Sequence, residues 1–568
     1  MLEDLLVQRV WRGMVRRLNN AAILRMARKI RTLAPTPGGA PVVFFKASTG
    51  IDDLSWNSGF HVLTSWALRL MGVPVVYFAC RSGMSHCVLG TDRLRPHRAP
   101  PCRSCLYQAR TLYDGADVVW FDYDADPVLA AALERLSVPE LAAFEWAGAL
   151  TNDARKDDSG AHRDVHESTP LGELCLPSLR WILRIHHLAD DENTRYLFKE
   201  YINSAWSLAR RFDAFLGRIQ PRAVVVFNGQ FFPEAACRYV ARQRGIRVIT
   251  HEVGLQPASA FFTDGDATAY PMTIPESFEL TESQNARLDN YLSRRFRGQF
   301  SMAGIKFWPR MRALDRGVLE RLASFRQLVP VFTNVVFDTS QPHANVLFPS
   351  MFEWLQLVAE AVRAHPETLF VIRAHPDELR IRKASRETVA EWVHANGIER
   401  ESNVLYVGPN EALSSYELIQ RSKFVMVYNS TIGLEASILG VPVLCGGKAR
   451  YTSYRTVFFP SSAAQLRSML EEFLASDVID VPEDFRVNAR RVLYYQLFRT
   501  SLEFDEFLRP SVRPTQARLR PFHPRRLSSS GSPAIRAILH GILNDGDFTL
   551  PEKLVEREAA VPNNGGDQ

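Results

Sequence analysis

The sequence of 568 residues has little cysteine and no long apolar segment. Its seven cysteines are too sparse for a disulfide scaffold, which favours a reducing compartment. No window reaches the roughly 18 consecutive apolar residues that a membrane-spanning helix needs. The first 33 residues lack the apolar stretch of a secretory signal, because arginines interrupt each apolar run. We therefore expect a cytoplasmic protein.

Acidic residues are scarce at the two ends of the chain, although the whole sequence is nearly balanced in charge. It carries 68 Lys and Arg against 62 Asp and Glu, a net charge of +6. Residues 1–33 hold eight basic and two acidic residues, and residues 509–526 hold six arginines and no acid. The rest of the chain therefore sums to −6. The basic character belongs to the ends, which argues against a nucleic-acid partner for the core.

Short β-branched or aromatic runs alternate with helical stretches along most of the chain. Several runs are continuously apolar, which is typical of strands buried on both faces of a parallel sheet. The helices between them fit a doubly wound fold. The sequence predicts an α/β protein with two doubly wound Rossmann-like domains that face a cleft. The clearest strands are 42–45, 75–78, 118–121, 223–227, 248–250, 329–333, 369–372, 404–407, 424–427 and 442–444.

The domain boundaries follow from these patterns and from changes in composition. A long helical, charged stretch without strand signals separates the two sets of strands, and the chain beyond Pro510 is rich in Pro, Arg and Ser. The predicted parts are a basic amphipathic helix at 1–35, an N-terminal Rossmann-like domain at 36–290 with a Cys-rich insertion at 80–105, a helical connection at 291–327, a C-terminal Rossmann-like domain at 328–483, a helix at 484–508, and a basic linker with a mostly disordered tail at 509–568.

The most informative segment reads FVMVYNSTIGLEASILGVPVLCGG. It predicts a strand, a turn of Asn429, Ser430 and Thr431, and a helix with Gly433 and Glu435 near its start. Such a helix start directs backbone N–H groups at the sheet edge where phosphates bind. The two hydroxyl groups add donors, and Glu435 is placed to accept hydrogen bonds from a ribose diol. A structural alternative stays open, in which Ser430 caps the helix and Glu435 complements its dipole.

A second segment, LFVIRAHPDE, predicts a buried strand that runs straight into Arg373 and His375. Both side chains emerge at one sheet edge, and together they can neutralise the charge of a departing phosphate. The same four residues, Arg-Ala-His-Pro, also occur at 363–366, so the two copies can be compared. That copy ends an amphipathic helix, where a basic residue complements the dipole and Pro follows the stop. A helix-end role explains the earlier copy, but no such role explains the copy at 373–376. The sequence therefore favours a ligand-binding role for the later copy.

A third segment ends the first strand of the second domain at Thr333 and Asn334. Small polar residues at this position either contact phosphate or cap the next helix, and both alternatives stay open.

These three segments, in this order, resemble the nucleotide-binding half of two-domain GT-B glycosyltransferases. More narrowly, they resemble bacterial capsule polysaccharide biosynthesis proteins, the group that includes the Kdo transferases. The resemblance covers about 325–508 well and the first domain loosely. It implies a nucleotide-sugar donor whose phosphate contacts His375, Ser430 and Thr431, with Glu435 on the ribose. Retaining members of the wider fold often carry a Glu at the position of Val427, so the resemblance implies an inverting, metal-independent transfer with no required cofactor.

An inverting transfer needs a general base for the acceptor hydroxyl, and we expect it at a strand end of the first domain. Asp52 and Asp53 follow the first strand, where adjacent carboxylates can raise one pKa. Glu252 follows a later strand and resembles a recurrent acid of the group. The structural alternative is that either Asp53 or Ser55 caps the start of the next helix.

Four cysteines lie within 26 residues, and the last two have the C-x-x-C spacing. Such a set can hold a structural zinc ion, although the spacing between the first two is longer than usual. An iron–sulfur cluster and plain packing of buried thiols are the alternatives. The cysteines are Cys80, Cys87, Cys102 and Cys105.

The basic N-terminal segment predicts an amphipathic helix that lies on the inner face of an anionic cell membrane or docks on the protein. Membrane attachment fits an enzyme that adds a sugar to a lipid-linked glycan acceptor in capsule or surface polysaccharide synthesis. The alternatives are a non-hydrolysing sugar-nucleotide epimerase of the same fold and a catalytically silent, metal-stapled scaffold.

Overall fold

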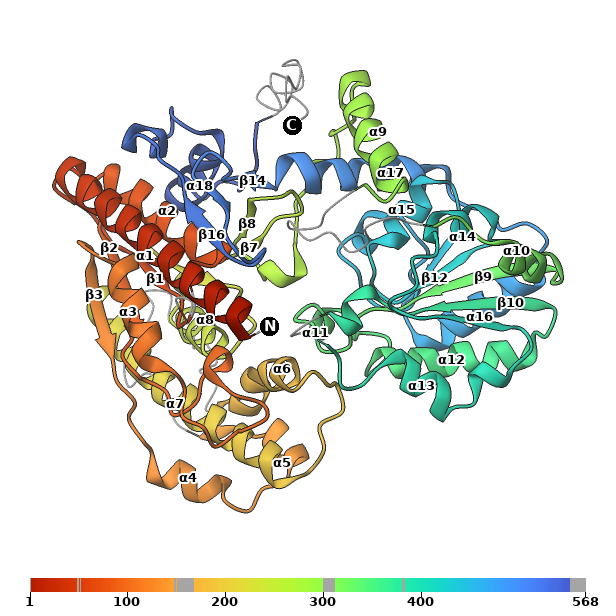
Figure 1. The fold of residues 1–568 in the computed structure, drawn as a ribbon, viewed down its shortest axis with the longest axis horizontal. Coiled ribbons are helices and arrows are strands. Elements are labelled where there is room, and N and C mark those ends of the chain that lie inside the picture. Colours follow the sequence, from red (N-terminus) through yellow and green to blue (C-terminus); the bar gives the residue numbers. More distant parts are fainter. Residues whose placement is uncertain are drawn as a thin grey trace, which may run out of the picture. The chain divides into compact units, whose positions relative to one another are not determined.

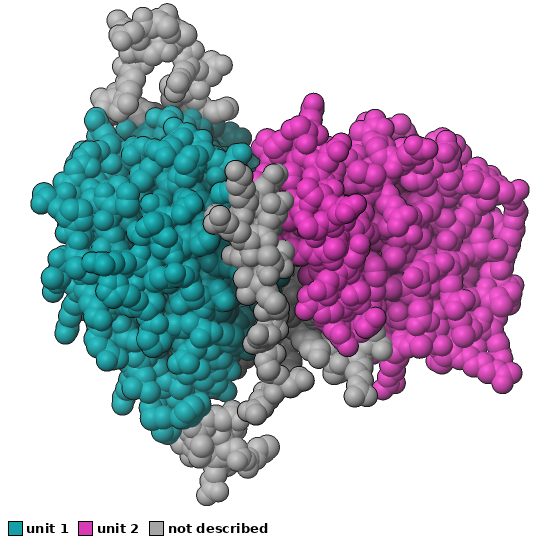
Figure 2. Space-filling model, turned by 90° about the horizontal axis from the view of Figure 1, so that it is seen from above, with its two compact units in different colours: residues 1–182, 188–272, 500–551 teal, residues 183–187, 273–499, 552–568 magenta. Residues whose placement is uncertain are grey.

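The computed structural model describes residues 2–48, 51, 53–147, 150, 168–299, 312–380 and 384–551. The chain divides into two compact units (Figure 2). Unit 1 comprises residues 1–182, 188–272 and 500–551, and unit 2 contains residues 183–187 and 273–499. Each unit is built on its own mainly parallel sheet, and the predicted α/β class with two Rossmann-like domains is confirmed.

Unit 1 holds a seven-stranded sheet in the order β14-β8-β7-β6-β1-β2-β3. The five strands from β7 to β3 are parallel, and β8 and β14 add an antiparallel edge. The chain moves outward in one direction from β1 to β3 and in the other from β6 to β7, so the switch point lies between β1 and β6. The strands are β1 (Val42–Phe45), β2 (Val75–Cys80), β3 (Asp117–Phe121), β6 (Ala223–Phe227), β7 (Val248–Val253), β8 (Ser259–Thr263) and β14 (Leu502–Glu503).

Helices cover the sheet of unit 1 and bury its apolar strands (Figure 1). The helices are α1 (Leu2–Leu33), α2 (Trp56–Leu70), α3 (Cys102–Leu112), α4 (Pro127–Leu133), α5 (Val138–Ala142), α6 (Leu171–Leu183), α7 (Glu192–Ile219), α8 (Glu234–Gln243) and α18 (Pro533–Asn544). Two small pairings complete it, β4 (Trp146–Ala147) with β5 (Ser168–Thr169) and β15 (Leu508–Pro510) with β16 (Ala517–Leu519).

Unit 2 holds a five-stranded parallel sheet in the order β11-β10-β9-β12-β13. All six residues of β10 are buried, as the continuous apolar run predicts for a strand covered on both faces. The strands are β9 (Gln327–Phe332), β10 (Thr368–Arg373), β11 (Val404–Val407), β12 (Val425–Val427) and β13 (Val443–Cys445). The helices are α9 (Glu282–Phe296), α10 (Arg316–Ala323), α11 (Gln341–Ala344), α12 (Met351–Ala364), α13 (Val389–Ala395), α14 (Ser415–Arg421), α15 (Ile432–Ile438), α16 (Ala463–Ala475) and α17 (Glu483–Tyr494).

The end of the chain differs from its predicted state. Residues 509–551 are not a linker, because β15, β16 and α18 pack on unit 1, where Leu527 and Ile538 are fully buried. Figure 1 shows this blue segment beside the red elements from the start of the chain. The predicted helix at 484–508 ends earlier, as α17 followed by one π-helical turn at Tyr495–Arg499. The Pro- and Arg-rich composition predicted a solvated linker, because the apolar residues that pack this segment on unit 1 are widely spaced.

The predicted connection at 291–327 also differs, because its described helices belong to unit 2. In α9, Arg295 is buried in an ion pair with Glu435, and α10 packs Leu319 and Leu322 on the core beside β9 and β10. The predicted N-terminal helix exists as the 32-residue α1, which is part of unit 1. Among the residues that the structure describes, no helix has both the length and the hydropathy to cross a membrane.

Candidate active site

The carboxyl ends of β9, β10 and β12 lie at one edge of the unit 2 sheet. The register pairs Phe332 at the end of β9 with Arg373 on one side and with Val427 on the other. The chain reverses its direction of strand addition between β9 and β12, which makes this edge the switch point of the sheet. Ligands of open α/β sheets bind in the crevice at such a point.

The loops after β9 and β12 meet through two asparagines. The side-chain amide of Asn334 donates to Oδ1 of Asn429 at 2.6 Å, and Oδ1 of Asn334 accepts the backbone N–H of Val335 at 2.8 Å. Both asparagines are half-buried. The structure therefore brings these two predicted site residues together across the switch point.

Thr333 has a different role from its predicted ligand contact. Its hydroxyl donates to the backbone carbonyl of Arg373 at 3.0 Å, and its side chain is buried. The hydroxyl thus joins the ends of β9 and β10. This bond between strand ends is a structural role different from the predicted cap of the next helix, and it already uses the hydroxyl within the protein.

Arg373 ends β10 as a buried cation beside the loop after β11. Its Nη2 donates to the backbone carbonyl of Glu411 at 3.2 Å. Burial lowers the pKa of Arg373 to about 10, and the Glu411 carboxylate opposes that shift. The guanidinium therefore remains charged at neutral pH, held by the protein at the sheet edge.

His375 follows Arg373 and caps the short 3₁₀ helix Pro376–Leu379. Its Nδ1 accepts the backbone N–H of Asp377 at 3.2 Å, which assigns the proton of the neutral ring to Nε2. Burial lowers the pKa of His375, and Arg373 adds to the shift, while Asp377 and Asp338 oppose it. A neutral His375 with an Nε2–H group can donate a hydrogen bond to a phosphate oxygen.

Ser430 and Thr431 form the turn between β12 and α15. The carbonyl of Ser430 accepts hydrogen bonds from the Tyr451 hydroxyl at 2.6 Å and from the Gly433 N–H at 3.2 Å. Within the described residues, no hydrogen bond occupies the two side-chain hydroxyls, which are half-buried. Since α15 has only seven residues, its dipole is short, and these hydroxyls are the stronger donors here.

Gly433 is required for packing. A Cβ atom there would lie 2.4 Å from the Tyr451 hydroxyl oxygen and 2.9 Å from Cγ2 of Val427. The glycine therefore lets α15 approach Tyr451, and it acts on the turn indirectly.

Glu435 does not have the predicted open position for a ribose. Its Oε1 pairs with the Arg295 guanidinium at 2.6 Å, its Oε2 accepts the Tyr416 hydroxyl, and the residue is 2% exposed. Both carboxylate oxygens are used inside unit 2, where they attach α15 to α9 and α14. The sequence missed Arg295 and Tyr416, which lie 140 and 19 residues from Glu435, because no local pattern signals a buried tertiary partner.

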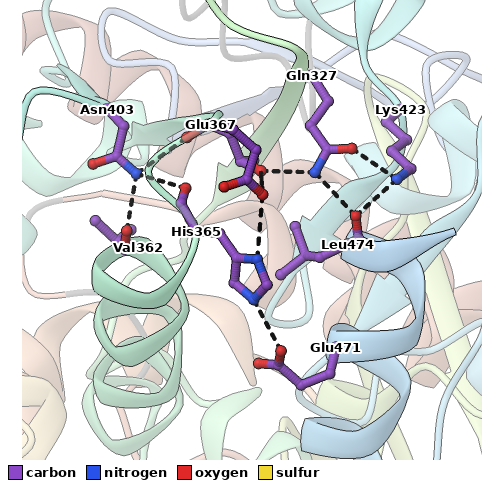
Figure 3. A network of polar contacts seen from close by, with 9 residues as sticks. Gln327, Val362, His365, Glu367, Asn403, Lys423, Glu471 and Leu474 are labelled. Carbon is purple, nitrogen blue, oxygen red and sulfur yellow. Dashed lines mark hydrogen bonds and ion pairs between the residues drawn. The ribbon is translucent and has the colours of Figure 1, made fainter. Parts of the chain in front are cut away.

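The earlier Arg-Ala-His-Pro copy lies at the end of α12, just before β10, as the structural explanation predicts. His365 pairs with Glu471 at 2.9 Å and with Glu367 at 3.3 Å (Figure 3). The nearby Asn403 amide donates to the carbonyls of Val362 and His365 at the end of α12. This network lies at the amino-terminal edge of the sheet. His365 therefore has a structural role, in contrast to His375 at the carboxyl edge.

Unit 1 gathers a second polar cluster after β6 and β7. Oε1 of Glu252 accepts the Asn57 amide at 2.6 Å, and Oε2 accepts the Asn228 amide at 2.9 Å. Glu252 is half-buried at the end of β7, whereas Asn57 lies in the first turn of α2. Glu252, one of the predicted bases, is therefore held in a polar cluster at the carboxyl edge of the unit 1 sheet. Asn57 had no motif that could have revealed it.

A buried lysine and a buried glutamate, Lys46 and Glu234, lie near this cluster. Lys46 follows β1, and its Nζ lies 4.4 Å from the ring centre of Phe227. Glu234, at the start of α8, accepts the backbone N–H of Ala47 at 2.9 Å. Burial raises the pKa of Glu234 to about 7 and lowers the pKa of Lys46, while their mutual attraction opposes both shifts.

Asp53 has a structural role. Its Oδ1 accepts the Leu54 N–H at 2.7 Å and the Asn19 amide at 3.3 Å, which attaches the loop after β1 to α1. Burial raises its pKa, although Leu54, Asn19 and Arg16 oppose the shift. Ser55 caps α2 as the alternative predicted. Asp52 lies outside the described residues.

The four clustered cysteines do converge, because all of them line one small apolar pocket of unit 1. Burial raises the pKa of Cys80 to about 12 and also raises that of Cys87, so both are thiols at neutral pH. In the part of the chain that the structure describes, no three His, Cys, Asp or Glu side chains are arranged to hold a metal ion. The structural zinc stays a prediction.

Comparison with known proteins agrees with the motifs of unit 2. Residues 312–454 match the family described as capsule polysaccharide biosynthesis protein. No curated protein matches the chain in sequence.

The solved structures to which the chain is similar include two of KpsC from Thermosulfurimonas dismutans. The β-Kdo 2,4 transferase is 13% identical, with 50% of this chain and 80% of that chain covered and a TM-score of 0.33. The β-Kdo 2,7 transferase is 15% identical, with 52% and 83% covered and a TM-score of 0.30. The UDP-GlcNAc 2-epimerase of Neisseria meningitidis is 14% identical, with 81% and 99% covered and a TM-score of 0.20.

The matched region contains Thr333, Arg373, His375 and the Asn429–Thr431 turn, so it includes the whole strand-end cluster of unit 2. Over residues 312–454 the chain is thus similar to capsule polysaccharide biosynthesis proteins, which confirms the resemblance to glycosyltransferases of this group that its motifs indicated.

Proposed function

We propose that this chain is a glycosyltransferase that moves a sugar from a nucleotide-sugar donor to a glycan acceptor in capsule or surface polysaccharide biosynthesis. The observation that carries the proposal is the cluster at the switch point of unit 2. There a buried arginine, a neutral histidine and two unoccupied hydroxyls lie on adjacent strand ends within the family match.

These groups suit the phosphate of a nucleotide leaving group. Arg373 supplies a fixed positive charge, and Nε2–H of His375 and the hydroxyls of Ser430 and Thr431 supply neutral donors. Charge that develops on the departing phosphate is stabilised best by donors that are already in place. In this proposal the transfer requires no metal, because the protein cation and donors take up the phosphate charge.

We assign the general base to Glu252. Its carboxylate is oriented by Asn57 and Asn228, and oriented carboxylates are suitable proton acceptors. Glu234 is buried and accepts a hydrogen bond from a backbone N–H, which makes it less accessible to an acceptor. The base therefore belongs to unit 1 and the donor groups belong to unit 2.

The stereochemical course is a separate part of the proposal. Val427 at the end of β12 is fully buried and offers no carboxylate for a retaining mechanism at that position. We therefore propose an inverting displacement, and NMR of the product should show the anomeric configuration opposite to that of the donor. Retention of the anomeric configuration would contradict the inverting mechanism but would not contradict the assignment of the donor site.

The acceptor in this proposal is a lipid-linked glycan, which the enzyme reaches while bound peripherally to a membrane. The α1 helix supports this part, since it is long and basic and carries exposed apolar side chains.

A thermal-shift panel of CMP-, UDP- and GDP-sugars tests the donor assignment. A ligand at a hundred times its dissociation constant stabilises a protein by about 2.7 kcal/mol, so a true donor should raise the melting temperature clearly. We expect one nucleotide class to do so and to support transfer to a glycan acceptor. Conversion of the donor sugar without any acceptor would instead indicate an epimerase.

A further inference from the structure

The two basic ends of the chain meet in one groove of unit 1. This groove, here called the basic groove, has a volume of about 460 Å³ and lies between α1 and the β15–β16 pair. Its lining contains no acidic residue. The cationic lining residues are Arg25, Lys29, Arg509, Arg518 and Arg520.

The groove is held in shape by a buried asparagine. Asn19 of α1 donates to the carbonyl of Ala517 at 3.3 Å, and its Oδ1 accepts the N–H of Leu519 at 2.9 Å. These bonds join α1 to β16, and Ile23 and Ile30 on the same helix are buried. The backbone positions of the cationic residues are therefore fixed by the hydrogen bonds between α1 and β16.

The cations of the groove lack acidic partners in the described part of the chain. Arg25 and Arg520 donate to the backbone carbonyls of Ala21 and Leu508, and no ion pair involves any of the five. Five like charges around one groove repel one another, and an anion that enters removes this repulsion. The groove thus favours a ligand with negative charge.

An exposed apolar stripe continues from the groove along α1. Val10, Met14 and Leu18 follow an i, i+4, i+8 spacing that places them on one helix face, and Trp11 lies next to Val10 in sequence. Trp11 and Leu18 belong both to the stripe and to the groove lining. The stripe consists of Val10, Trp11, Met14 and Leu18, which are 70%, 51%, 45% and 64% exposed.

We propose that the basic groove binds the phosphate headgroup of an anionic phospholipid while the apolar stripe enters the membrane interface. A soluble phosphate or an anionic glycan would satisfy the cations but leave four large apolar side chains in water. A membrane surface satisfies both, because basic residues contact headgroups and apolar residues lie at the acyl boundary. This inference deepens the peripheral attachment in the proposed function.

Co-sedimentation with vesicles tests the inference without measuring sugar transfer, so that it and the donor assignment can fail separately. The full chain is mixed with vesicles of phosphatidylglycerol and phosphatidylcholine, or of phosphatidylcholine alone, at about 0.15 M salt. We expect at least tenfold stronger binding to the anionic vesicles. Equal binding to both would overturn the proposal, and so would no binding.

Two variants and a control identify the surface. The groove variant Arg25→Gln/Lys29→Gln/Arg509→Gln removes three exposed charges, and the stripe variant Met14→Gln/Leu18→Gln keeps every charge. The control, Arg135→Gln/Arg218→Gln/Arg242→Gln, removes three exposed arginines of unit 1 that do not line the groove.

We expect the groove variant to lose at least tenfold in affinity and the stripe variant at least fivefold, with the control within twofold of wild type. Unchanged melting temperatures show that the variants fold. An equal loss in the control would show non-specific charge attraction and contradict the groove. An unaffected stripe variant, with binding competed fully by free glycerol phosphate, would show a site for soluble anions and contradict membrane docking.

Discussion

The side-chain amide of Asn334 donates a 2.6 Å hydrogen bond to Oδ1 of Asn429, and this bond joins the loops after β9 and β12 across the switch point of unit 2. The two residues are 95 positions apart in sequence. The bond fixes the turn that carries Ser430 and Thr431 relative to the loop that begins at Thr333.

Asn334→Ala should weaken both donor binding and the stability of the fold. A typical hydrogen bond contributes about 0.5–1.5 kcal/mol to stability, so the unfolding free energy should fall by about that amount. The freed Asn429 turn should raise the dissociation constant of the nucleotide-sugar about tenfold, which corresponds to about 1.4 kcal/mol. Titration calorimetry and denaturant unfolding measure the two effects, and an unchanged dissociation constant would contradict the role of this bond.

Glu252→Gln should reduce the turnover number while donor affinity stays the same. Glutamine preserves the shape of the side chain but cannot accept the acceptor proton, and general base catalysis contributes about 10²–10⁴-fold. The donor groups lie in unit 2, so the dissociation constant of the donor should not change. A turnover number within twofold of wild type would exclude Glu252 as the base.

Glu234 should make the stability of the protein depend on pH. Burial raises the pKa of folded Glu234 to about 7, above its ordinary value of 4.5. The folded state therefore holds a proton that the unfolded state has lost, and stability falls as pH rises from about 4.5 through 7. Relative to Glu234→Gln, wild type should lose on the order of 2–3 kcal/mol across this window.

The comparison with the variant is needed because Glu378 in unit 2 has its pKa raised to about 7 by burial as well. Denaturant unfolding of both proteins at several pH values gives the difference. Parallel curves for wild type and Glu234→Gln would show that Glu234 does not hold its proton in the folded state.

Glu435→Gln should destabilise unit 2 and leave the nucleotide affinity of the folded protein unchanged. The substitution leaves the buried Arg295 guanidinium without its ionic partner, which typically costs about 3–5 kcal/mol. The double variant Arg295→Met/Glu435→Gln should cost less than the two single changes together. A stable Glu435→Gln protein with strongly reduced nucleotide affinity would instead support the predicted contact between Glu435 and the ribose.

Local patterns predicted the sheets well because their strands are unusual in composition. Strands such as β10 are buried on both faces and read as continuous apolar runs, and all ten predicted strands are present. Two strands of the seven-stranded sheet were missed: β14 has only two residues, and β8 is the five-residue antiparallel strand between β14 and β7. The packing of residues 509–551 on unit 1 was missed because buried residues such as Leu519 and Leu527 are too widely spaced to show a period.

The candidate site was predicted in part. Arg373, His375 and the turn after β12 were visible because strand ends in a parallel sheet meet at one edge. The partners that decide what each side chain can do were not visible. Arg295 binds Glu435 from α9, and Asn57 orients Glu252 from α2, because tertiary packing selects such pairs.

The most direct measurement of the central claim is calorimetric titration of the donor nucleotide-sugar into two alanine variants that alter the same four-residue motif. His375→Ala changes the copy at the switch-point edge, and His365→Ala changes the copy in the structural network at the opposite edge (Figure 3). We predict that His375→Ala raises the dissociation constant at least tenfold and that His365→Ala leaves it within twofold of wild type. Equal affinities for His375→Ala and wild type would contradict a nucleotide-sugar site at this edge of unit 2.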